Sequence, residues 1–482
     1  MLKYIIIGLL LTGCAAGPDY KRPEVATPAQ FKEGWVNTAA LPTTVPDAWW
    51  AVYDDATLNA LEVQVAQANQ SLRAAFYTYS QAQALADTAR AAEYPTVGAG
   101  ISSSKTSANG VVSSTGATTT TTTSGKSASL TASWTPDLWG KVSRQVEADQ
   151  ASSAASLETL RAAQLSLQGT LAQDYFLIRQ LDAQTALARN TVAVDEKSLR
   201  ITQNRYKAGI ATSADEALAE ATLANARVQQ VSFGIQRAQL EHAIAVLTGQ
   251  PPANFTLAFM PDLQEPALIP AGLPSQLLLR RPDLIAAERQ VAAANAQIGV
   301  SKSAYFPALT LSGQRGWRGP SLSNLVSAPN LFWSMGPALT ATLLDGGARK
   351  AQIKQSQAAY QIAVAQYRQL SLTALQQVED QLVAITTLTE EAALQKLSVA
   401  ANERSLRLAT DQYKAGTVSY LNVVNAQTAS YAARNTALTI SGQRYTASVA
   451  LIQALGGGWG KSTHAELGES VTDVTQQHPL PK

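Results

Sequence analysis

The sequence is poor in the residues that build disulfides and metal sites. Its 482 residues include one Cys and three His. One Cys cannot form a disulfide within the chain, and so few Cys and His side chains exclude a structural zinc site of the usual kind. Lys and Arg (37) nearly balance Asp and Glu (35). The chain therefore lacks the basic excess that is typical of nucleic-acid-binding proteins.

Long apolar runs are also missing, and proline is absent from two long stretches. The mean hydropathy is −0.05, which excludes a polytopic helical membrane protein with several apolar spans of ~20 residues. No proline lies between Pro136 and Pro251, or between Pro337 and Pro479. Because proline breaks helices, both stretches can form very long helices. Their abundant Ala, Gln and Leu favour the same structure.

The N-terminus has the features of a secretion signal. Lys3 precedes a short apolar run that ends in Leu11-Thr12-Gly13-Cys14. The run is too short to cross a bilayer, and its end resembles a bacterial lipobox. We therefore expect a signal peptide at 1–13 and a covalent lipid on Cys14, with no other cofactor and no metal. Several acyl chains would anchor the protein stably, and Ala15 in place of Asp after the Cys favours the outer membrane.

The rest of the chain is a duplication. Ser198-Leu199-Arg200 recurs 207 residues later as Ser405-Leu406-Arg407, and the same offset relates Tyr206–Gly209 to Tyr413–Gly416. A repeat of about 200 residues indicates a duplicated domain and not a short solenoid. The expected segments are a lipidated N-terminal segment at 14–54, a first repeat at 55–250, a linker at 251–281, a second repeat at 282–458 and a polar tail at 459–482.

Both repeats contain the same succession of patterns. A helical stretch, Asp55–Glu93 or Pro282–Tyr305, ends at a proline. Alternating apolar residues then predict a strand hairpin at ~97–135 and another at ~308–344. In the second hairpin the alternation runs on through Leu339, Ala341 and Leu343. Inside the first, the polar run Thr118–Thr123 predicts a flexible loop.

Long helical hairpins are predicted after the strands, at ~141–248 and ~348–455. Their apolar residues recur at spacings of 3, 4 and 7, as in coiled coils. Gly209 and Gly416 stand where each hairpin reverses, a position that favours a residue with positive φ.

Four strands are too few to close a barrel, which needs about eight. An open sheet edge in a membrane leaves backbone groups without hydrogen bonds, so chains must pool their strands. Two chains would supply eight strands, and three would supply twelve.

Several short motifs cover nearly the whole chain. They are Gly17-Pro18-Asp19-Tyr20-Lys21-Arg22-Pro23, Trp49-Trp50, Arg205–Gly209, Arg280-Arg281-Pro282-Asp283, Ala293–Gly299, Tyr413–Gly416 and Ala454–Trp459. In this order they resemble the outer membrane efflux proteins of the TolC type, most closely the NodT-like lipoprotein branch.

This resemblance implies a mainly α-helical fold with a membrane β-barrel. Three identical chains would form a 12-strand barrel in the outer membrane and a 12-helix tube in the periplasm. The tube would be the passive exit duct of a tripartite efflux pump. Its partners would be a periplasmic adaptor protein and an inner-membrane transporter of the RND type.

The resemblance also implies a gate at the periplasmic helix tips. Tyr413 matches a gate tyrosine, and Asn422 and Asn425 fall where relatives often carry aspartates that line the pore. Asp215 is the counterpart of Asn422 in the first repeat. Amides in place of carboxylates predict weak cation selectivity. The alternative is that these polar residues only solvate helix ends.

Other motifs are best interpreted as structural. Trp49-Trp50 could anchor at a membrane interface, but packing at the tube's waist is favoured. Arg280–Asp283 indicates a helix start. The glycine-rich run 456–462 lacks the spacing of a P-loop, and no H-E-x-x-H or G-x-S-x-G occurs. We therefore expect no enzyme.

The remaining alternatives are a coiled-coil spacer lipoprotein and an envelope enzyme. The exported substrate stays open among drugs, solvents, metals and small signals.

Overall fold

A computed structural model describes residues 16–32, 48–111, 118–263, 265–266, 269 and 280–458. Cys14, the signal peptide and the tail 459–482 lie outside the described residues. In chain order the elements are η2 (Trp49–Tyr53), α2 (Ala56–Ala68), α3 (Gln70–Ala91), β1 (Thr96–Val111), β2 (Thr118–Trp134), α4 (Lys141–Lys207), α5 (Ser213–Leu247), η3 (Pro252–Asn254), α7 (Pro282–Ser303), β3 (Ala308–Gly319), η4 (Ala328–Asn330), β4 (Leu331–Thr340), α8 (Ala348–Lys414) and α9 (Tyr420–Ala454).

The described residues fall into two compact units that do not coincide with the two repeats. The sheet unit takes the chain up to Glu24, Thr78–Leu157 and Ala286–Tyr367. The helix unit takes Val25–Tyr77, Glu158–Ile285 and the chain from Arg368 onward. Each repeat thus gives a strand hairpin to one unit and a helical hairpin to the other.

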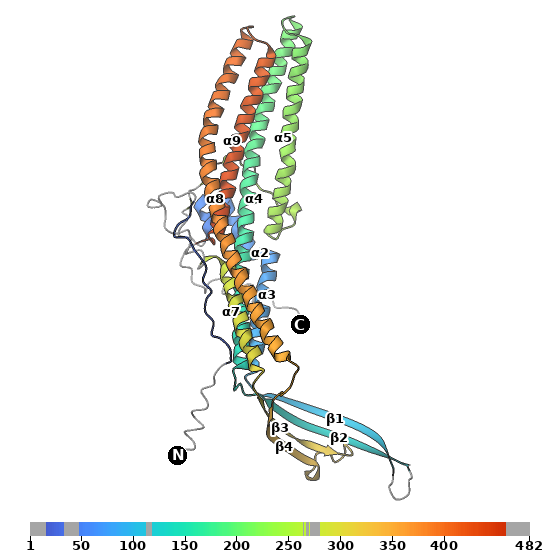
Figure 1. Ribbon diagram of the computed structural model, residues 1–482. Helices are drawn as coiled ribbons and strands as arrows, with labels where there is room; N and C mark the ends of the chain where they lie inside the picture. The colour runs from blue at the N-terminus through green and yellow to red at the C-terminus, as the bar shows by residue number, and fades with distance from the viewer. Residues whose placement is uncertain are drawn as a thin grey trace. The chain divides into compact units, whose positions relative to one another are not determined.

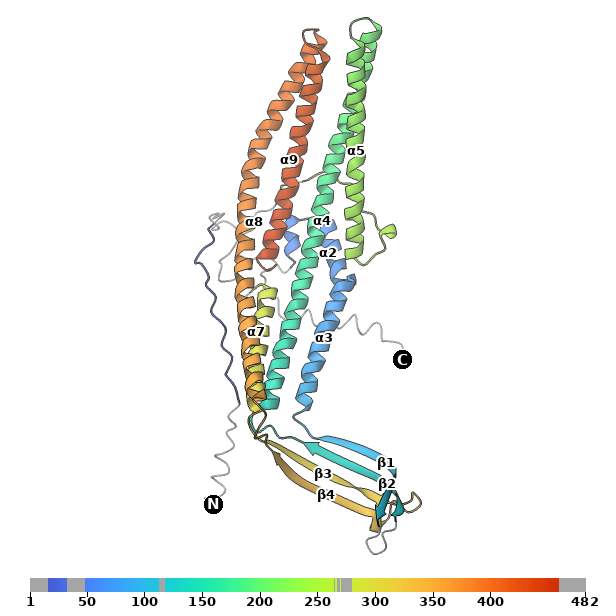
Figure 2. The same ribbon diagram turned by 45° about the vertical axis from the view of Figure 1, so that its right-hand side comes forward.

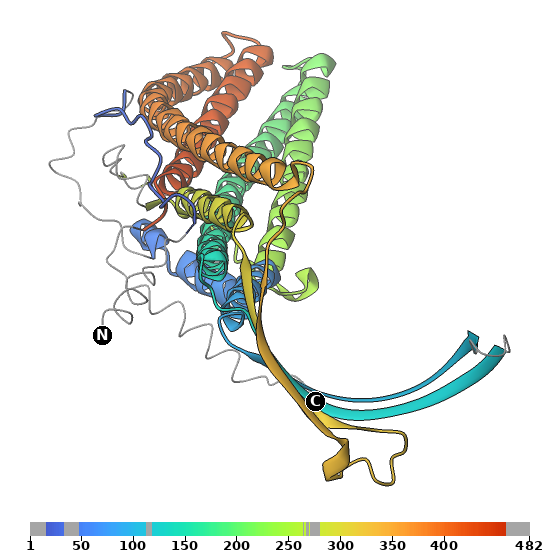
Figure 3. The same cartoon turned by 60° about the horizontal axis from the view of Figure 1, so that its bottom comes forward.

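The sheet unit contains one antiparallel sheet in the order β1-β2-β3-β4. The two hairpins are joined by β2 and β3, which pair from Lys126↔Gly319 to Trp134↔Leu311. The strands bow along their length (Figure 3). Strands β1 and β4 are the edges of the sheet, and neither has a second partner among the described residues.

Two expectations about these strands were wrong. Thr118–Thr123 is not a loop but the start of β2, where it pairs with Thr106–Val111 of β1. β-Branched threonines favour extended backbone, and this preference outweighs their polarity. Strand β4 also ends earlier than predicted, at Thr340, opposite Ala308. The next pair along these two strands would be Ala341 with Pro307, which has no N–H to donate to the ladder.

The helix unit is built from two helical hairpins (Figure 1, Figure 2). Within it α4 and α9 are the inner pair, with α5 beside α4 and α8 beside α9. Small residues let the inner helices approach closely. A Cβ on Gly442 would lie 1.8 Å from Gln180 Oε1. Farther along the same seam, Gln184 Nε2 donates to Asn435 Oδ1 at 3.0 Å.

The helical stretch that the sequence predicted at Asp55–Glu93 consists of two helices, α2 and α3. Asn69 has an extended backbone with ψ of 123° and separates α2 from α3. Its Oδ1 accepts a hydrogen bond from Leu72 N at 3.0 Å, so it caps α3 as a short polar side chain commonly does. Asn69 Nδ2 in turn donates to the carbonyl of Leu247 at 2.9 Å.

The main core of the helix unit surrounds Trp49. This side chain is 1% exposed and packs with residues of α2 and α4. Phe176 stacks on Tyr445 of α9, with ring centroids 4.2 Å apart. Trp49 therefore has a packing role within this unit, as the sequence interpretation favoured.

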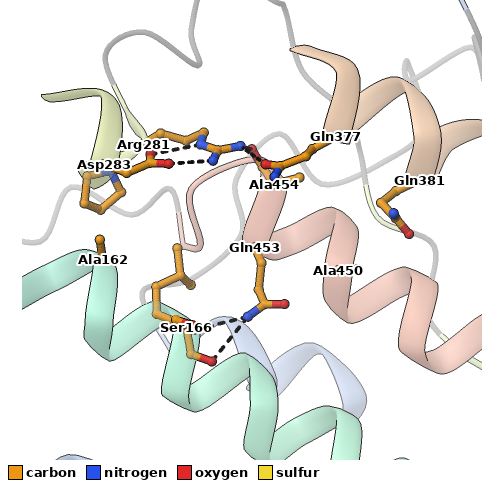
Figure 4. A pocket seen from close by; sticks show the side chains of 11 residues that line it. Ala162, Ser166, Arg281, Asp283, Gln377, Gln381, Ala450, Gln453 and Ala454 are labelled. Carbon is orange, nitrogen blue, oxygen red and sulfur yellow. Dashed lines mark hydrogen bonds and ion pairs between the residues drawn. The ribbon is translucent and has the colours of Figure 1, made fainter. Parts of the chain in front are cut away.

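The Arg280–Asp283 motif starts a helix, as expected, and makes further contacts. Pro282 opens α7. The Arg281 guanidinium pairs with Asp283 at 2.6 Å and donates to Gln377 of α8 at 2.8 Å (Figure 4). It also donates to the carbonyl of Ala454 in α9 at 3.2 Å. Beside it lies a hollow of ≈ 400 Å³.

Among the helices that the structure describes, none has the length and apolarity needed to cross a membrane.

Candidate functional site

The sheet has one apolar and one polar face. Residues paired directly across strands share a face, so the register assigns every strand position. One face carries the large apolar side chains, several of them widely exposed: Val97, Ile101, Leu130, Trp134, Leu309, Leu311, Trp317, Leu331, Trp333, Met335 and Leu339. The opposite face carries mainly small and polar residues: Gly98, Gly100, Ser102, Ser127, Ser129, Thr131, Ser133, Thr310, Ser312, Gln314 and Ser334.

Several large side chains of the apolar face are exposed to solvent, which is unfavourable in water. Ile101 is 83% exposed, Met335 79% and Trp333 70%. Large contiguous apolar patches mark surfaces that contact lipid or protein. This alternation of apolar and polar faces is the pattern of membrane β-barrel strands.

The turns at the helix tips are alike in both repeats. Gly209 follows α4 with φ of +74°, and Gly416 follows α8 with φ of +80°. In each turn the residue after the glycine donates back to the helix: Ile210 N to Arg205 O at 2.8 Å, and Thr417 N to Gln412 O at 3.0 Å. Glycine suits these positions because a Cβ is disfavoured at positive φ.

The helix starts that follow these turns differ. Thr212 caps α5 through a capping box: its Oγ1 accepts from Asp215 N at 3.2 Å, and Asp215 accepts from Thr212 N at 3.0 Å. Ser419 occupies the matching position before α9 and makes no side-chain cap. Instead, the Asn422 amide donates to the Ser419 hydroxyl at 3.2 Å. The Asp215 carboxylate is thus occupied with its own helix start.

An apolar cluster joins the two hairpins at their tips. We call it the tip cluster; its buried members are Ala219, Tyr413, Tyr420, Val423 and Val424. The rings of Tyr413 and Tyr420 lie 5.4 Å apart. Of the four gate residues predicted from the sequence, the structure therefore buries Tyr413 in this cluster. Asn422 and Asn425 lie on the exposed side of α9.

Arg205 connects the first hairpin to the second at this point. Its guanidinium lies 4.5 Å from the centre of the Tyr413 ring, and one of its nitrogens donates to the Tyr413 carbonyl at 3.3 Å. Three buried polar atoms nearby have no hydrogen-bond partner among the described residues: Arg205 Nε, Tyr413 Oη and Thr202 Oγ1. The contact between the two hairpins is therefore a cation–π contact with an incomplete set of hydrogen bonds among the described residues.

Two ionisable groups at the tip have raised pKa values: Asp195, which lies close to the tip cluster, and Tyr420, which belongs to it. Burial raises the pKa of Asp195, a residue of α4 that is 3% exposed, to about 6. Burial, together with the nearby Asp195 carboxylate, raises the pKa of Tyr420 to about 12. Tyr420 therefore stays neutral at physiological pH, whereas Asp195 titrates close to it.

Sequence reasoning missed Arg205, Asp195 and Tyr420. A usable signal was present in the duplication, because the offset of 207 relates Arg205 to Gln412 and Asp195 to Asn402. The two repeats differ at these positions although the surrounding motif is retained. Tyr206, the counterpart of the buried Tyr413, is 45% exposed.

The segment after Cys14 is fixed to the sheet unit. Ala16 N donates to the carbonyl of Trp139 at 3.1 Å, and the Trp139 indole donates to the carbonyl of Pro307, just before β3, at 2.7 Å. Gly17 has φ of +109°, and a Cβ there would lie 2.5 Å from the backbone of Gly299. The first described residues are thus held beside the ends of β2 and β3.

The rest of the Gly17–Pro23 motif makes polar contacts with three helices. We call residues 16–22 the N-terminal strap. Its contacts are Asp19 with Arg144 at 2.8 Å, the Pro18 carbonyl with Asn295 at 2.9 Å, Tyr20 with Glu288, and Arg22 with Tyr367 at 3.1 Å. The motif's conspicuous polar residues therefore fasten the chain start to α4, α7 and α8.

No group of three or more His, Cys, Asp and Glu side chains within the described ranges could hold a metal ion.

Comparison with known proteins agrees with this geometry. The profile of the outer membrane efflux protein family matches residues 61–250 and 273–457. The antibiotic efflux pump outer membrane protein ArpC of Pseudomonas putida is 30% identical over 471 residues, 96% of each chain. The cation efflux system protein CusC of Escherichia coli is 29% identical over 462 residues, 94% of this chain and 97% of its own.

A solved structure shows the same fold. The outer-membrane channel OprN superposes with a TM-score of 0.85 at 28% identity, covering 92% of this chain and all of OprN. The mainly helical fold with strand hairpins, predicted from the sequence, is confirmed. The chain belongs to the outer membrane efflux protein family.

Proposed function

We propose that three copies of this chain form the outer membrane exit duct of a tripartite efflux pump. The duct conducts substrates passively, so the protein itself catalyses no reaction. A periplasmic adaptor protein and an inner-membrane transporter of the RND type are its partners. The observation that carries this proposal is the two-faced sheet, whose apolar side suits lipid and whose polar side suits a water-filled lumen.

The open edges of the sheet support assembly from several chains. Strands β1 and β4 each present an unpaired edge within the described chain, which a bilayer does not tolerate. Pairing β1 of one copy with β4 of the next closes the sheet. Three copies give twelve strands, enough for an open channel, whereas eight strands would enclose only side chains. The spacer alternative does not account for this sheet.

Exposed apolar stripes on the outer helices support the same assembly. In α5, Val228, Val231 and Ile235 are 64%, 70% and 64% exposed, at spacings of 3 and 4. In α8, Leu394 and Leu397 are 60% and 69% exposed, at a spacing of 3. These are coiled-coil spacings, and none of the described helices of the chain covers them.

The two apolar stripes lie at similar distances from the helix tips. Val228 and Val231 lie 15 and 18 residues after the start of α5 at Ser213. Leu397 and Leu394 lie 17 and 20 residues before the end of α8 at Lys414. Because the tip cluster holds both hairpin ends together, α5 of one copy meets α8 of the next with these residues opposed. The resulting ring contains twelve helices.

The N-terminal strap supports the lipid anchor. Cys14 precedes by two residues the Ala16 that is held beside the ends of β2 and β3. A lipid on Cys14 would therefore enter the membrane next to the strands. The apolar face of the sheet and the lipid on Cys14 would both attach the sheet unit to the membrane, which agrees with a location in the outer membrane. The lipid is the only cofactor that we assign.

The gate in this proposal is the tip cluster with its Arg205–Tyr413 contact. Tyr413 and Arg205 keep the two hairpins together, and Asn422, Asn425 and Asp215 lie on the helix starts around the aperture. Gly209 and Gly416 form the rim to which the adaptor binds. Because amides stand at 422 and 425, we expect weak selectivity for cations. ArpC and CusC are named for antibiotics and cations respectively, so the pump and not the duct selects the substrate.

Single-channel conductance in planar bilayers tests this function. We expect a small conductance for the mature protein and one several times larger for Arg205→Gln, which gives α4 the residue that α8 carries at Gln412. Arg200→Gln, an exposed position on the same helix, is the matched control and should behave as the unmodified protein. The proposal is overturned if neither the unmodified protein nor Arg205→Gln forms pores.

A further inference from the structure

The strands carry basic residues but no acidic ones. No Asp or Glu occurs between Glu93 and Asp137, or between Glu288 and Asp345. The charged residues of the four strands are Lys105, Lys126, Arg315 and Arg318. Such a bias creates a positive surface that attracts anions.

Three of these four cations lie on the apolar face. Arg315 is paired with Leu130 on one side and with Trp333 on the other. Lys126 is paired with Ser103, and Lys105 stands two residues farther along β1 on the same face. Arg318 is paired with Ser127 and so belongs to the polar face. The side of the sheet that suits lipid thus holds a basic group.

The level of Lys126 marks the outer limit of the apolar band. At the level of Arg315 the neighbours are Leu130 and Trp333, and one level farther out they are Trp317 and Leu331. The next level, Ser103, Lys126 and Gly319, has no large apolar side chain. Each level rises about 7 Å along the strands, so Arg315 lies about 14 Å from the level of Lys126, and its long side chain can extend part of the way toward that border.

Tryptophan beside basic residues at this border is a combination suited to lipid headgroups. Trp333 is 70% exposed, and Trp317 lies one level farther out. Indole rings favour the membrane interface, and Arg and Lys bind phosphate oxygens. No hydrogen bond or ion pair of the Arg315 guanidinium is made within the described part of the chain, so its donors are available to a ligand.

We propose that Lys105, Lys126 and Arg315, with Trp317 and Trp333, form a binding site for phosphorylated lipid headgroups in the outer leaflet of the membrane. The three cations extend over six residues of strand, about 20 Å, which suits a headgroup with more than one phosphate better than a single phosphate ion. This inference rests on the proposed function, because that function places the apolar face in lipid and the hairpin ends at the cell exterior.

The test measures binding of lipid A, which has two phosphates, to the mature full-length protein in detergent by native mass spectrometry. We expect bound lipid A in the unmodified protein and a loss of affinity of at least about tenfold in Lys105→Gln/Lys126→Gln/Arg315→Gln. Arg318→Gln is the matched control for Arg315→Gln, since it removes the same charge from the same strand on the polar face, and it should bind as the unmodified protein does. Raising the salt concentration should weaken binding.

Two other ligands test whether the site prefers lipid A, and single variants replace the triple variant if it does not fold. Phosphatidylglycerol and inorganic pyrophosphate should bind more weakly than lipid A; equal binding of pyrophosphate would overturn the assignment to lipid. If the triple variant does not fold, Arg315→Gln and Lys126→Gln alone should each lose part of the affinity. Equal affinity in the triple variant and the unmodified protein, or an equal loss in Arg318→Gln, would overturn the site. Conductance of the same preparations separates this outcome from failure of the proposed function, which would abolish pores altogether.

Discussion

At the scale of single residues, Glu62 is a buried carboxyl of the helix unit. It lies in α2 with 0% of its surface exposed, and neither carboxylate oxygen has a hydrogen-bond partner among the described residues. Burial raises its pKa from 4.5 to about 9. The folded protein therefore keeps a proton at this carboxyl that the unfolded chain releases.

This raised pKa predicts how stability depends on pH. The contribution of the Glu62 carboxyl to the free energy of unfolding is greatest below the unfolded pKa of 4.5. It is lost progressively as the pH rises toward the folded pKa. We expect Glu62→Gln to reduce the fall in thermal unfolding temperature between about pH 5 and about pH 8. Circular dichroism at both pH values measures it, with the exposed Glu220→Gln as control. An unchanged fall in Glu62→Gln would contradict the assignment.

At the scale of elements, the two hairpins differ in how their returning helices begin. The capping box of Thr212 and Asp215 secures the first turn of α5, whereas α9 has no side-chain cap. We expect Thr212→Ala to weaken the start of α5 by about 1 kcal/mol and Ser419→Ala to have a smaller effect on α9. Hydrogen exchange of the amides in the first turns compares the two. Equal changes in amide exchange at the starts of both helices would show that the capping box gives α5 no extra stability.

Much of the element structure was predictable from sequence, because its causes are local. Gly209 and Gly416 mark the turns through their positive φ, and missing prolines permit the long helices. Thr118–Thr123 was misjudged because polarity was weighed above β-branching. The break at Asn69 was missed because a single capping side chain gives a weak signal within a helical pattern.

The candidate site was less predictable, because its contacts join distant residues. The Arg205–Tyr413 contact joins residues 208 positions apart, and no local pattern indicates which helices lie together. The burial of Tyr413 but not of Tyr206 likewise depends on a tertiary contact, because the tip cluster packs Tyr413 against Tyr420 and Ala219 and leaves Tyr206 outside. The placement of Asn422, Asn425 and Asp215 around an aperture came from family resemblance and remains a prediction.

At the scale of the whole molecule, the level stripes of α5 and α8 predict a specific contact between copies. In protein with Val231→Cys and Leu394→Cys together, mild oxidation should produce disulfide-linked dimers and trimers on denaturing gels, because Cys14 is the only native cysteine and is expected to be lipidated. Each single variant should give none.

A matched pair tests the register of that contact. Leu372 is also exposed on α8 but lies far from the level of Val231, so Val231→Cys with Leu372→Cys should not cross-link. Intact trimers on native gels without any Val231–Leu394 cross-link would show that the chains assemble through another surface. Absence of trimers would instead count against the exit duct itself.

The unequal length of the two strand hairpins has a consequence for variation. Beyond Lys126↔Gly319 only β1 and β2 continue, from Ser104↔Gly125 to Val111↔Thr118. A two-stranded ribbon has little stability of its own, and no other described strand depends on it. Insertions and deletions at its end should therefore accumulate among related bacteria with little effect on the pore. A peptide tag inserted there would be displayed to antibodies on intact cells, which makes this ribbon the place to label the protein from outside.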